Sequence, residues 1–198
     1  MSDRVLDHLA ASEPVALGRL HDALVARAER DGLLDVGYRT VDSPLGSLLL
    51  AATSAGLVRV AFAAEGHDDV LGALATTVSP RILEAPGRLD DVTRQLEEYF
   101  TGTRHAFDVA VDLRLAAGFR LAVLRHLQEI PFGATESYAD VARAAGSPNA
   151  VRAAGTACAT NPVPVVVPCH RVVRSDGSPG GYRGGTAAKQ VLLALEAA

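Results

Sequence analysis

Apolar residues recur at nearly helical spacing in the first 36 residues of the chain. They are Val5, Leu9, Leu17, Leu20, Leu24 and Val25. This period predicts a helix, with a break at Glu13-Pro14 and an end near Asp31-Gly32, because proline and glycine interrupt helices. We interpret residues 1–36 as a helical extension.

After this extension the pattern changes to short runs rich in β-branched and aliphatic residues, separated by turn residues. It predicts two strands within residues 38–53 about a turn at Ser43-Pro44-Leu45-Gly46, strands at 56–62 and 106–113, and helices near 69–77 and 90–100. Consecutive strands joined by short turns form an antiparallel meander. Residues 37–113 are therefore predicted to form a small α+β domain.

From Ala116 onward the pattern is mainly helical. An apolar stripe of Phe119, Val123, Leu124 and Leu127 ends at Ile130-Pro131-Phe132-Gly133. A short helix is predicted from about Ser137 to Ala145, and a second to about Ala159, with Ser147 as its cap and Pro148 in its first turn. Two helices joined by a tight turn form a helix-turn-helix. Residues 114–198 are therefore predicted to form a second, helical domain.

The second of these two helices has faces of different character. One face holds Val151, Ala154 and Cys158, and the other holds Arg152, Gly155, Thr156 and Ala159. The first face predicts that Cys158 lies in the core. On the second face one arginine stands among small residues, which would let the backbone approach a phosphate chain. An ordinary helical pair in a bundle produces the same pattern, so this face alone does not establish nucleic-acid binding.

Composition limits the class of protein. With 198 residues, 48% of them hydrophobic, the chain can bury the core of one or two small globular domains. The net charge is −4, but residues 113–198 hold nine basic and five acidic residues whereas residues 1–112 hold ten and eighteen. A basic second half suits an anionic partner, although basic residues also serve solubility alone.

No uncharged stretch is long enough to span a bilayer and no signal peptide is evident, so we expect a cytoplasmic protein. Its two cysteines should then be reduced. The histidines lack the paired spacing of metal ligands, and we expect neither a metal nor another cofactor.

The candidate chemistry lies in Pro168-Cys169-His170-Arg171, which follows the uncharged run at residues 163–167. Cysteine reacts as a thiolate, and His170 and Arg171 offer a base and a positive charge. Neighbours in an extended chain point to opposite sides, so Cys169 and His170 would couple through a turn or a bridging water. Glu196, which closes the last helical run, is a carboxylate that could orient the imidazole. Cysteine beside histidine is equally consistent with a buried, unreactive thiol.

Several motifs in order give this cysteine a context. They are Ile130-Pro131-Phe132-Gly133, Thr135-Glu136-Ser137-Tyr138, Ala150-Val151-Arg152-Ala153, Asn161-Pro162, Pro168-Cys169-His170-Arg171-Val172, Gly180-Gly181-Tyr182-Arg183-Gly184-Gly185, and Lys189 with Leu192, Leu193 and Glu196. Together they resemble the O6-alkylguanine-DNA alkyltransferase family over about residues 38–198. The resemblance implies a small ribonuclease-H-like α/β domain followed by a winged-helix-like domain that contains the helix-turn-helix.

The resemblance also implies the reaction. An alkyl group would pass from O6 of guanine in double-stranded DNA to Cys169, irreversibly and once per molecule, with no cofactor and with the protein as a monomer. His170 would act as the base through water, oriented by Glu196. Tyr138 would assist departure of the guanine, and Asn161 would hold the turn that carries the cysteine.

The family's mode of DNA binding assigns the remaining residues. The helix-turn-helix would enter the minor groove, and Arg152 would fill the gap left by a flipped base. Ser137, Thr156 and Ala159 would contact the DNA beside it. The substrate pocket would be formed by Val172, Tyr182, Arg183 and Gly184. The position of Arg183 is equally consistent with a side chain that faces solvent.

Three other functions fit part of the pattern. A non-catalytic relative would bind lesions and recruit excision repair, but such proteins usually replace the cysteine of the core motif. A transcriptional regulator would use the helix-turn-helix alone and sense alkylation through Cys169. A cysteine hydrolase would need direct contact between Cys169 and His170.

Overall fold

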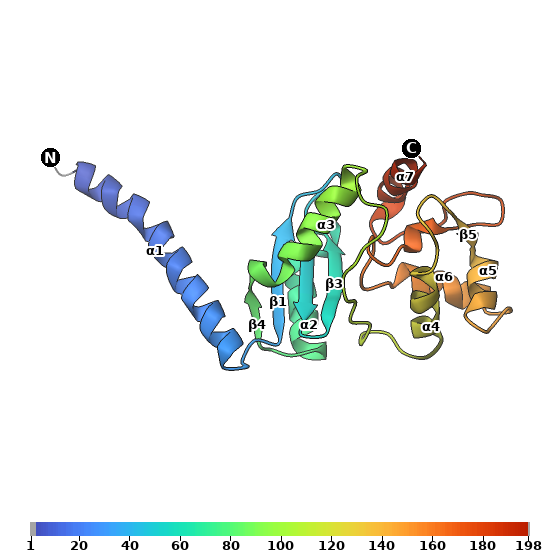
Figure 1. The fold of residues 1–198 in the computed structure, drawn as a ribbon, viewed down its shortest axis with the longest axis horizontal. Helices are drawn as coiled ribbons and strands as arrows, with labels where there is room; N and C mark the ends of the chain where they lie inside the picture. The colour runs from blue at the N-terminus through green and yellow to red at the C-terminus, as the bar shows by residue number, and fades with distance from the viewer. Residues whose placement is uncertain (1–2, 198) are drawn as a thin grey trace.

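The computed structural model describes the backbone of residues 3–197 and the side chains of residues 16–197. Helix α1 (Asp3–Arg30) projects from the rest of the molecule at the N-terminal end (Figure 1). The break predicted at Glu13-Pro14 is wrong, because α1 continues through it. A proline inside a helix removes one backbone hydrogen bond and kinks the helix without having to end it.

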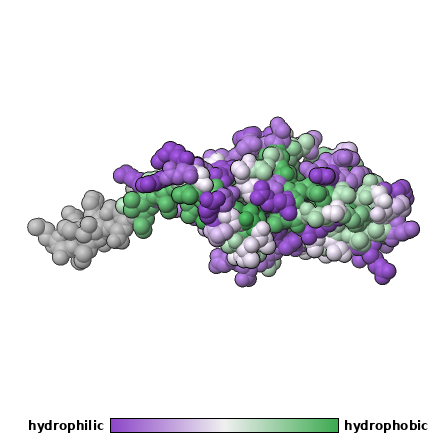
Figure 2. Space-filling view, turned by 90° about the horizontal axis from the view of Figure 1, so that it is seen from below, coloured by the Kyte–Doolittle hydropathy of each residue, from purple (hydrophilic) through white to green (hydrophobic). Residues whose placement is uncertain are grey.

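Only the C-terminal turns of α1 rest on the body. Val25 and Ala28 pack against Leu34 and Ala85, and the ring of His21 lies 2.6 Å from the carbonyl oxygen of Glu84. Nearer the N-terminus the helix leaves this support. Leu17, Leu20 and Leu24 are 66%, 68% and 52% exposed there, and they form the apolar surface next to the grey atoms in Figure 2.

The first folded unit is a four-stranded mixed sheet in the order β3-β2-β1-β4. Its strands are β1 (Val36–Val41), β2 (Leu48–Thr53), β3 (Gly56–Phe62) and β4 (Ile82–Glu84). The predicted meander of β1, β2 and β3 is confirmed. Strand β4 was not predicted, and it pairs in parallel with β1 at the edge of the sheet.

Both faces of the sheet are buried, because a helix covers each one. On one face Leu48 and Leu50 pack in the same core as α3 (Asp90–Phe100), and on the other Leu49 and Ala51 pack with α2 (His67–Thr77). Alternate residues of β2 therefore enter two different cores. Both helices match the predicted helical segments.

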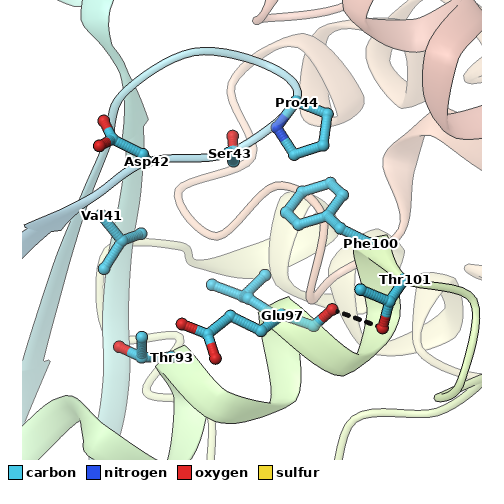
Figure 3. A pocket seen from close by; sticks show the side chains of 9 residues that line it. Val41, Asp42, Ser43, Pro44, Thr93, Glu97, Phe100 and Thr101 are labelled. Carbon is cyan, nitrogen blue, oxygen red and sulfur yellow. Dashed lines mark hydrogen bonds between the residues drawn. The ribbon is translucent and has the colours of Figure 1, made fainter.

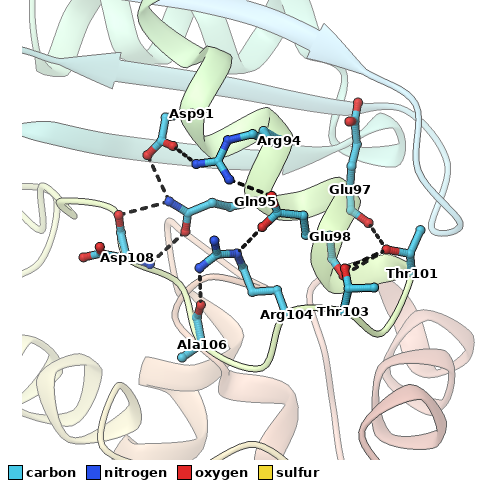
Figure 4. Close-up of polar contacts among 10 residues, drawn as sticks. All are labelled: Asp91, Arg94, Gln95, Glu97, Glu98, Thr101, Thr103, Arg104, Ala106 and Asp108. Atoms are coloured by element: carbon cyan, nitrogen blue, oxygen red, sulfur yellow. Dashed lines mark hydrogen bonds and ion pairs between the residues drawn. The ribbon is translucent and has the colours of Figure 1, made fainter.

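The strand predicted at 106–113 is wrong. Its only ladder contact is an isolated bridge between Val111 and Leu57, in which Leu57 donates to Ala110 and accepts from Asp112, each at 2.8 Å. Polar contacts instead tie this segment to α3 (Figure 4). The side chain of Gln95 donates to the carbonyl oxygen of Asp108 at 3.1 Å and accepts from its backbone N–H at 2.8 Å.

The second folded unit is helical. It comprises α4 (Gly118–Leu127), β5 (Glu136–Ser137), α5 (Tyr138–Ala144), α6 (Val151–Ala159), the short 3-10 helix η3 (Cys169–Arg171), β6 (Val172–Val173) and α7 (Gly185–Glu196). The predicted helix-turn-helix is α5 and α6. Strands β5 and β6 pair in parallel and bring the start of α5 beside the end of η3.

The start of α6 differs from the prediction. Ser137 caps α5, accepting from the backbone of Asp140, but α6 begins at Val151 after Ala150 and not at Ser147. The carbonyl of Ser147 accepts from the backbone of Ala150 in a turn that precedes the helix. Cys158 is buried as predicted and so is Ala154 on the same face, whereas Val151 at the start of that face is 38% exposed.

One hydrophobic core runs across both units. Phe62 and Tyr99 from the sheet unit belong to the same buried cluster as Val167, Cys169 and Leu192 from the helical unit. Cys169 therefore lies where the two units meet. Among the described residues, no helix has both the length and the apolar character needed to cross a membrane.

Candidate active site

Cys169 lies at the start of η3, directly after Pro168, and is 1% exposed. Asn161 braces the turn before it. Its Nδ2 donates to the carbonyl oxygen of Val167 (2.8 Å) and to Sγ of Cys169 (3.1 Å), and its Oδ1 accepts from the backbone of Val163 (3.0 Å). The sulfur is thus held by an amide that also fixes the backbone around it.

The segment that leads to Cys169 is a series of turns and not an extended run. Val165 has a φ of 74°, in the left-handed region that β-branched residues rarely adopt. Such strain persists only where the surrounding structure enforces it, and it concentrates at functional sites. Cys169 and His170 belong to the same 3-10 turn, so of the two couplings expected from the sequence, a turn or a bridging water, the structure shows the turn.

Burial raises the pKa of the Cys169 thiol to about 11, although the hydrogen bond from Asn161 and the charge of Lys189 act in the opposite direction. The thiol is therefore protonated at neutral pH in the resting protein. A reaction at this sulfur requires a base that removes the proton as the new bond forms.

His170 is completely buried, and its Nε2 lies 2.8 Å from Oε1 of Glu196. Burial lowers the pKa of His170, while Glu196 raises it, and the net direction is downward. A neutral imidazole that donates from Nε2 to the carboxylate carries no proton on Nδ1. Nδ1 is buried without a hydrogen-bond partner among the described residues, and it is the nitrogen that can accept a proton. No direct hydrogen bond joins His170 to Cys169 in the described part of the chain.

Glu196 is held by four donor residues from three parts of the chain. It accepts from Tyr99 (2.6 Å), from His170 (2.8 Å), from Nε and an amino group of Arg171 (2.9 and 2.8 Å) and from the backbone of Gly133 (3.3 Å). Burial raises the pKa of Glu196, but the hydrogen bonds from His170 and Arg171 outweigh it and hold the pKa far below its usual range. The carboxylate therefore stays charged and keeps the imidazole oriented.

Tyr138 begins α5 and points between two glycines. A Cβ on Gly180 would lie 2.7 Å from the Tyr138 hydroxyl, and one on Gly155 would lie 3.9 Å from its ring. Gly180 also has a φ of +66°, so glycine is required there for both reasons. Burial raises the pKa of Tyr138, which keeps its hydroxyl protonated and able to donate.

Lys189 joins Tyr138 to the strand that follows the cysteine. It is fully buried, its Nζ donates to the carbonyl oxygen of Val172, and Nζ lies 5.9 Å from the centroid of the Tyr138 ring. The positive charge of Lys189 lowers the pKa of the Cys169 thiol and so favours the thiolate. The sequence predicted Lys189 only as a member of a motif, without a role of its own.

The predicted pocket residues lie at the junction of the two units. The Tyr182 ring packs edge-on against Phe62 (5.7 Å between centroids) and His170 (6.4 Å). Gly184 faces the same phenylalanine, because a Cβ there would lie 2.7 Å from the Phe62 ring. Arg183 turns to the sheet unit and pairs with Glu65 at 2.5 Å, with 30% of its side chain exposed.

Three of the four predicted DNA-binding residues lie elsewhere, on the outer face of α6. Arg152, Thr156 and Ala159 are exposed, and Arg152 forms no ion pair with any described residue. Ser137 is half-buried and serves as the cap of α5. The structure thus groups Cys169, His170, Glu196 and Asn161 in one buried cluster and leaves the α6 residues apart from it.

A separate cavity of about 240 Å³ lies in the sheet unit, between the β1–β2 turn and α3 (Figure 3). Apolar side chains such as Val41, Pro44 and Phe100 line it, together with Asp42 and Glu97. It shares no lining residue with the cysteine cluster. Among the described residues, no group of three or more histidines, cysteines or acids could hold a metal ion.

Two family models match the chain. The ribonuclease-like domain of 6-O-methylguanine DNA methyltransferase matches residues 36–113, and the DNA binding domain of the same family matches residues 118–198. A methylated-DNA–protein-cysteine methyltransferase of Mycolicibacterium paratuberculosis is 40% identical over 161 residues, which are 81% of this chain and 92% of that protein.

Solved structures agree with these matches. The O6-methylguanine methyltransferase of Mycobacterium tuberculosis superposes with a TM-score of 0.72 at 37% identity, over 82% of this chain and 93% of that one. A structure of Mycobacterium tuberculosis OGT in complex with DNA gives a TM-score of 0.70 at 38% identity, over 81% and 92% of the two chains.

Proposed function

Because this chain belongs to the 6-O-methylguanine DNA methyltransferase family, we propose that Cys169 is the residue that accepts the alkyl group. The activity of the protein is that of a methylated-DNA–protein-cysteine methyltransferase, which repairs DNA by methyl transfer to a cysteine. Cys169 is supported by one arrangement above all: its sulfur is fixed by Asn161 directly beside the buried pair of His170 and Glu196.

The proposed reaction is a displacement at the alkyl carbon of O6-methylguanine. A bond forms between Sγ of Cys169 and the methyl carbon while the bond from that carbon to O6 breaks. The thiol proton passes through water to Nδ1 of His170, and Glu196 stabilises the resulting imidazolium. The electron pair of the broken bond stays on guanine, whose negative charge the Tyr138 hydroxyl relieves by donating a hydrogen bond. The guanine then regains a proton.

The product explains why each molecule acts once. Methylation of Cys169 gives a thioether, which has no proton to lose and is a poor leaving group. The buried cluster holds no second nucleophile aimed at that carbon. We therefore propose a stoichiometric reaction, by a monomer in the cytoplasm, where the thiol stays reduced.

Binding of DNA is assigned to the helix-turn-helix, in a domain that spans residues 114–198 after a sheet domain at 37–113. The related Mycobacterium tuberculosis protein has been solved in complex with DNA. Here α6 presents Arg152 with Thr156 and Ala159 on an exposed face, and Ser137 lies at the start of α5. We place this face in the minor groove, with Arg152 in the gap left by the flipped guanine.

The flipped base would enter between Val172 and the glycine-rich loop that carries Tyr182, Arg183 and Gly184. Small residues in this loop let the backbone approach a planar base closely. Tyr138, whose ring lies near Nζ of Lys189, and Tyr182, whose ring packs against His170, would supply aromatic surfaces for the base.

The decisive test is the intact mass of the protein after mixing with a duplex that carries one O6-methylguanine, followed by peptide mapping. We expect one added methyl group per molecule, on Cys169, with guanine restored in the DNA. Cys169→Ala should bind the duplex and gain no mass. Cys158→Ala removes the other buried thiol and is the matched control, which should react like the unaltered protein. A lesion-bound protein with no methyl on Cys169, or with methyl on Cys158, would refute the assignment.

A further inference from the structure

Tyr99 reaches the cysteine cluster from the other folded unit. It is the penultimate residue of α3, in the sheet unit, and none of its surface is exposed. Its hydroxyl donates to Oε1 of Glu196 at 2.6 Å and lies 3.4 Å from Nε2 of His170. Among the described residues it is the one side chain of the sheet unit that hydrogen-bonds to this pair.

The phenol is held firmly in this position. The Tyr99 ring packs against Phe100 (5.5 Å between centroids), Phe107 (5.1 Å) and Phe132 (6.2 Å), the last of which comes from the helical unit. The loop that follows α3 is tied back to the helix, since Arg104 pairs with Glu98 at 2.7 Å (Figure 4). The hydroxyl therefore has little freedom to leave Glu196.

Three donors converge on the same oxygen of Glu196. They are Tyr99, His170 and Arg171, at 2.6, 2.8 and 2.8 Å. Because Nε2 of His170 is already a donor to this oxygen, the phenol hydrogen has the carboxylate as its acceptor and not the imidazole. A hydrogen bond donated to the carboxylate spreads its charge and weakens its attraction for the imidazole proton.

We infer that Tyr99 is a positioning residue of the alkyl transfer, which orients the His170–Glu196 pair and sets how strongly His170 holds a proton. This inference rests on the proposed function, in which His170 receives the thiol proton. It makes the sheet unit a participant in the chemistry and not only a support. Removal of the hydroxyl leaves more of the carboxylate charge to stabilise the imidazolium.

The test uses Tyr99→Phe, which keeps the ring and removes only the hydroxyl. Reaction of Cys169 with free O6-benzylguanine is followed by intact mass across a range of pH. We expect a rate about tenfold lower at neutral pH, a smaller loss than the roughly 10²–10⁴-fold that a general base itself supplies. We also expect the acidic limb of the profile to move to higher pH, because His170 now stays protonated to higher pH.

Tyr38→Phe is the matched control, since Tyr38 lies on β1 and packs in the other core of the sheet. Its profile should coincide with that of the unaltered protein. The second measurement is the titration of His170 by nuclear magnetic resonance in unreacted protein, in which Tyr99→Phe should raise the midpoint. This readout does not depend on the rate of transfer.

An unchanged pH profile and an unchanged His170 midpoint would overturn the inference. So would an equal loss of rate at every pH together with a lower melting temperature, which is the signature of a packing role alone. Failure of the unaltered protein to label Cys169 would instead count against the proposed function. The two failures are therefore distinguishable in one experiment.

Discussion

The buried cysteine cluster and the exposed face of α6 differ in how their charged side chains are paired. In the cluster the charge of Glu196 is met by four donor residues from three segments, which lie 25, 26, 63 and 97 residues away in sequence. On the short helix α6, Arg152 forms no ion pair with the residues that the structure describes. A group that reacts must be oriented before the substrate arrives, whereas a group that inserts into DNA must be free until then.

The largest effect should come from the cluster. His170→Gln removes the proton acceptor while it leaves a side chain that can still bond Glu196, so transfer to Cys169 should slow by roughly 10²–10⁴-fold. The loss should be the same for a duplex that carries O6-methylguanine and for free O6-benzylguanine, because both need the thiolate. Rates from intact mass and duplex affinity from fluorescence anisotropy measure the two properties.

Duplex affinity should stay unchanged in His170→Gln, since His170 is completely buried and lies outside α6. A similar loss of binding would show that the cluster and the face are one structural unit. In that case the contrast between them would have no functional meaning.

The next effect separates the face from the cluster. Arg152→Ala should slow repair of the duplex by about 10–100-fold, because base flipping costs a few kcal/mol and the inserted arginine offsets part of that cost. Reaction with free O6-benzylguanine needs no flipping and should be unaffected. The ratio of the two rates is the quantity to measure.

Arg143→Ala is the matched control for Arg152→Ala. Arg143 is an exposed arginine on α5 that pairs with Asp140 at 2.7 Å. Its removal should change the ratio little. Parallel losses on both substrates in Arg152→Ala would contradict the insertion of Arg152 into the duplex.

The same contrast explains what could be predicted from the sequence. The face of α6 follows from helical periodicity within nine residues, and the helix-turn-helix was found from local signals. Cys169, His170 and Glu196 were named because ordered motifs resemble a known family. Tyr99 was missed, because nothing near it in the sequence indicates that its hydroxyl meets a carboxylate 97 residues later.

The incorrect predictions of secondary structure also have physical reasons. The segment 106–113 has the composition of a strand, but Leu57 offers it only one bridging position and side chains of α3 take the remaining contacts. β4 is a three-residue strand, too short for alternation to be visible. At the start of α6, the turn formed by Ser147 and Ala150 displaced the expected cap. Long-range partners decided the first two cases, since Leu57, α3 and β1 lie far away in sequence, whereas a local turn decided the third.

Acid should lower the stability that the buried cysteine cluster contributes and leave the exposed face of α6 unchanged. The pKa of His170 is lowered on folding, so the unfolded chain binds its proton more readily and stability falls as pH drops below the ordinary value near 6.5. The pKa of Glu196 is also lowered, so its contribution is present above the ordinary value near 4.5 and is lost at lower pH. Urea midpoints should therefore decrease between pH 7.5 and pH 5.5, where the His170 contribution dominates.

His170→Gln tests this assignment of the pH dependence. The decrease in the urea midpoint between pH 7.5 and pH 5.5 should be smaller in the variant than in the unaltered protein. An equally steep decrease would assign the pH dependence to groups other than His170.

The smallest effect should come from the ionic contact that joins the glycine-rich loop to the sheet unit. Glu65 pairs with Arg183 of that loop and with Arg59, whose guanidinium also donates to the carbonyl oxygen of Pro162 at 3.2 Å. Only 7% of the Arg59 side chain and 14% of the Glu65 side chain are exposed. Glu65→Gln keeps the shape but removes the charge, and it should lower the free energy of unfolding by about 1–3 kcal/mol.

The transfer rate should change by less than about threefold in Glu65→Gln, because no atom of this contact touches the thiol, the imidazole or Glu196. Asp35→Asn is the control, since Asp35 also pairs with an arginine but on the surface, where a pair contributes less. A large loss of rate with unchanged stability would show that Glu65, acting through Arg183, shapes the pocket itself. The cysteine cluster would then depend on the sheet unit at two residues, Glu65 and Tyr99. The comparison with α6 would then be between the junction of the two units and the DNA-binding face, and not simply between interior and surface.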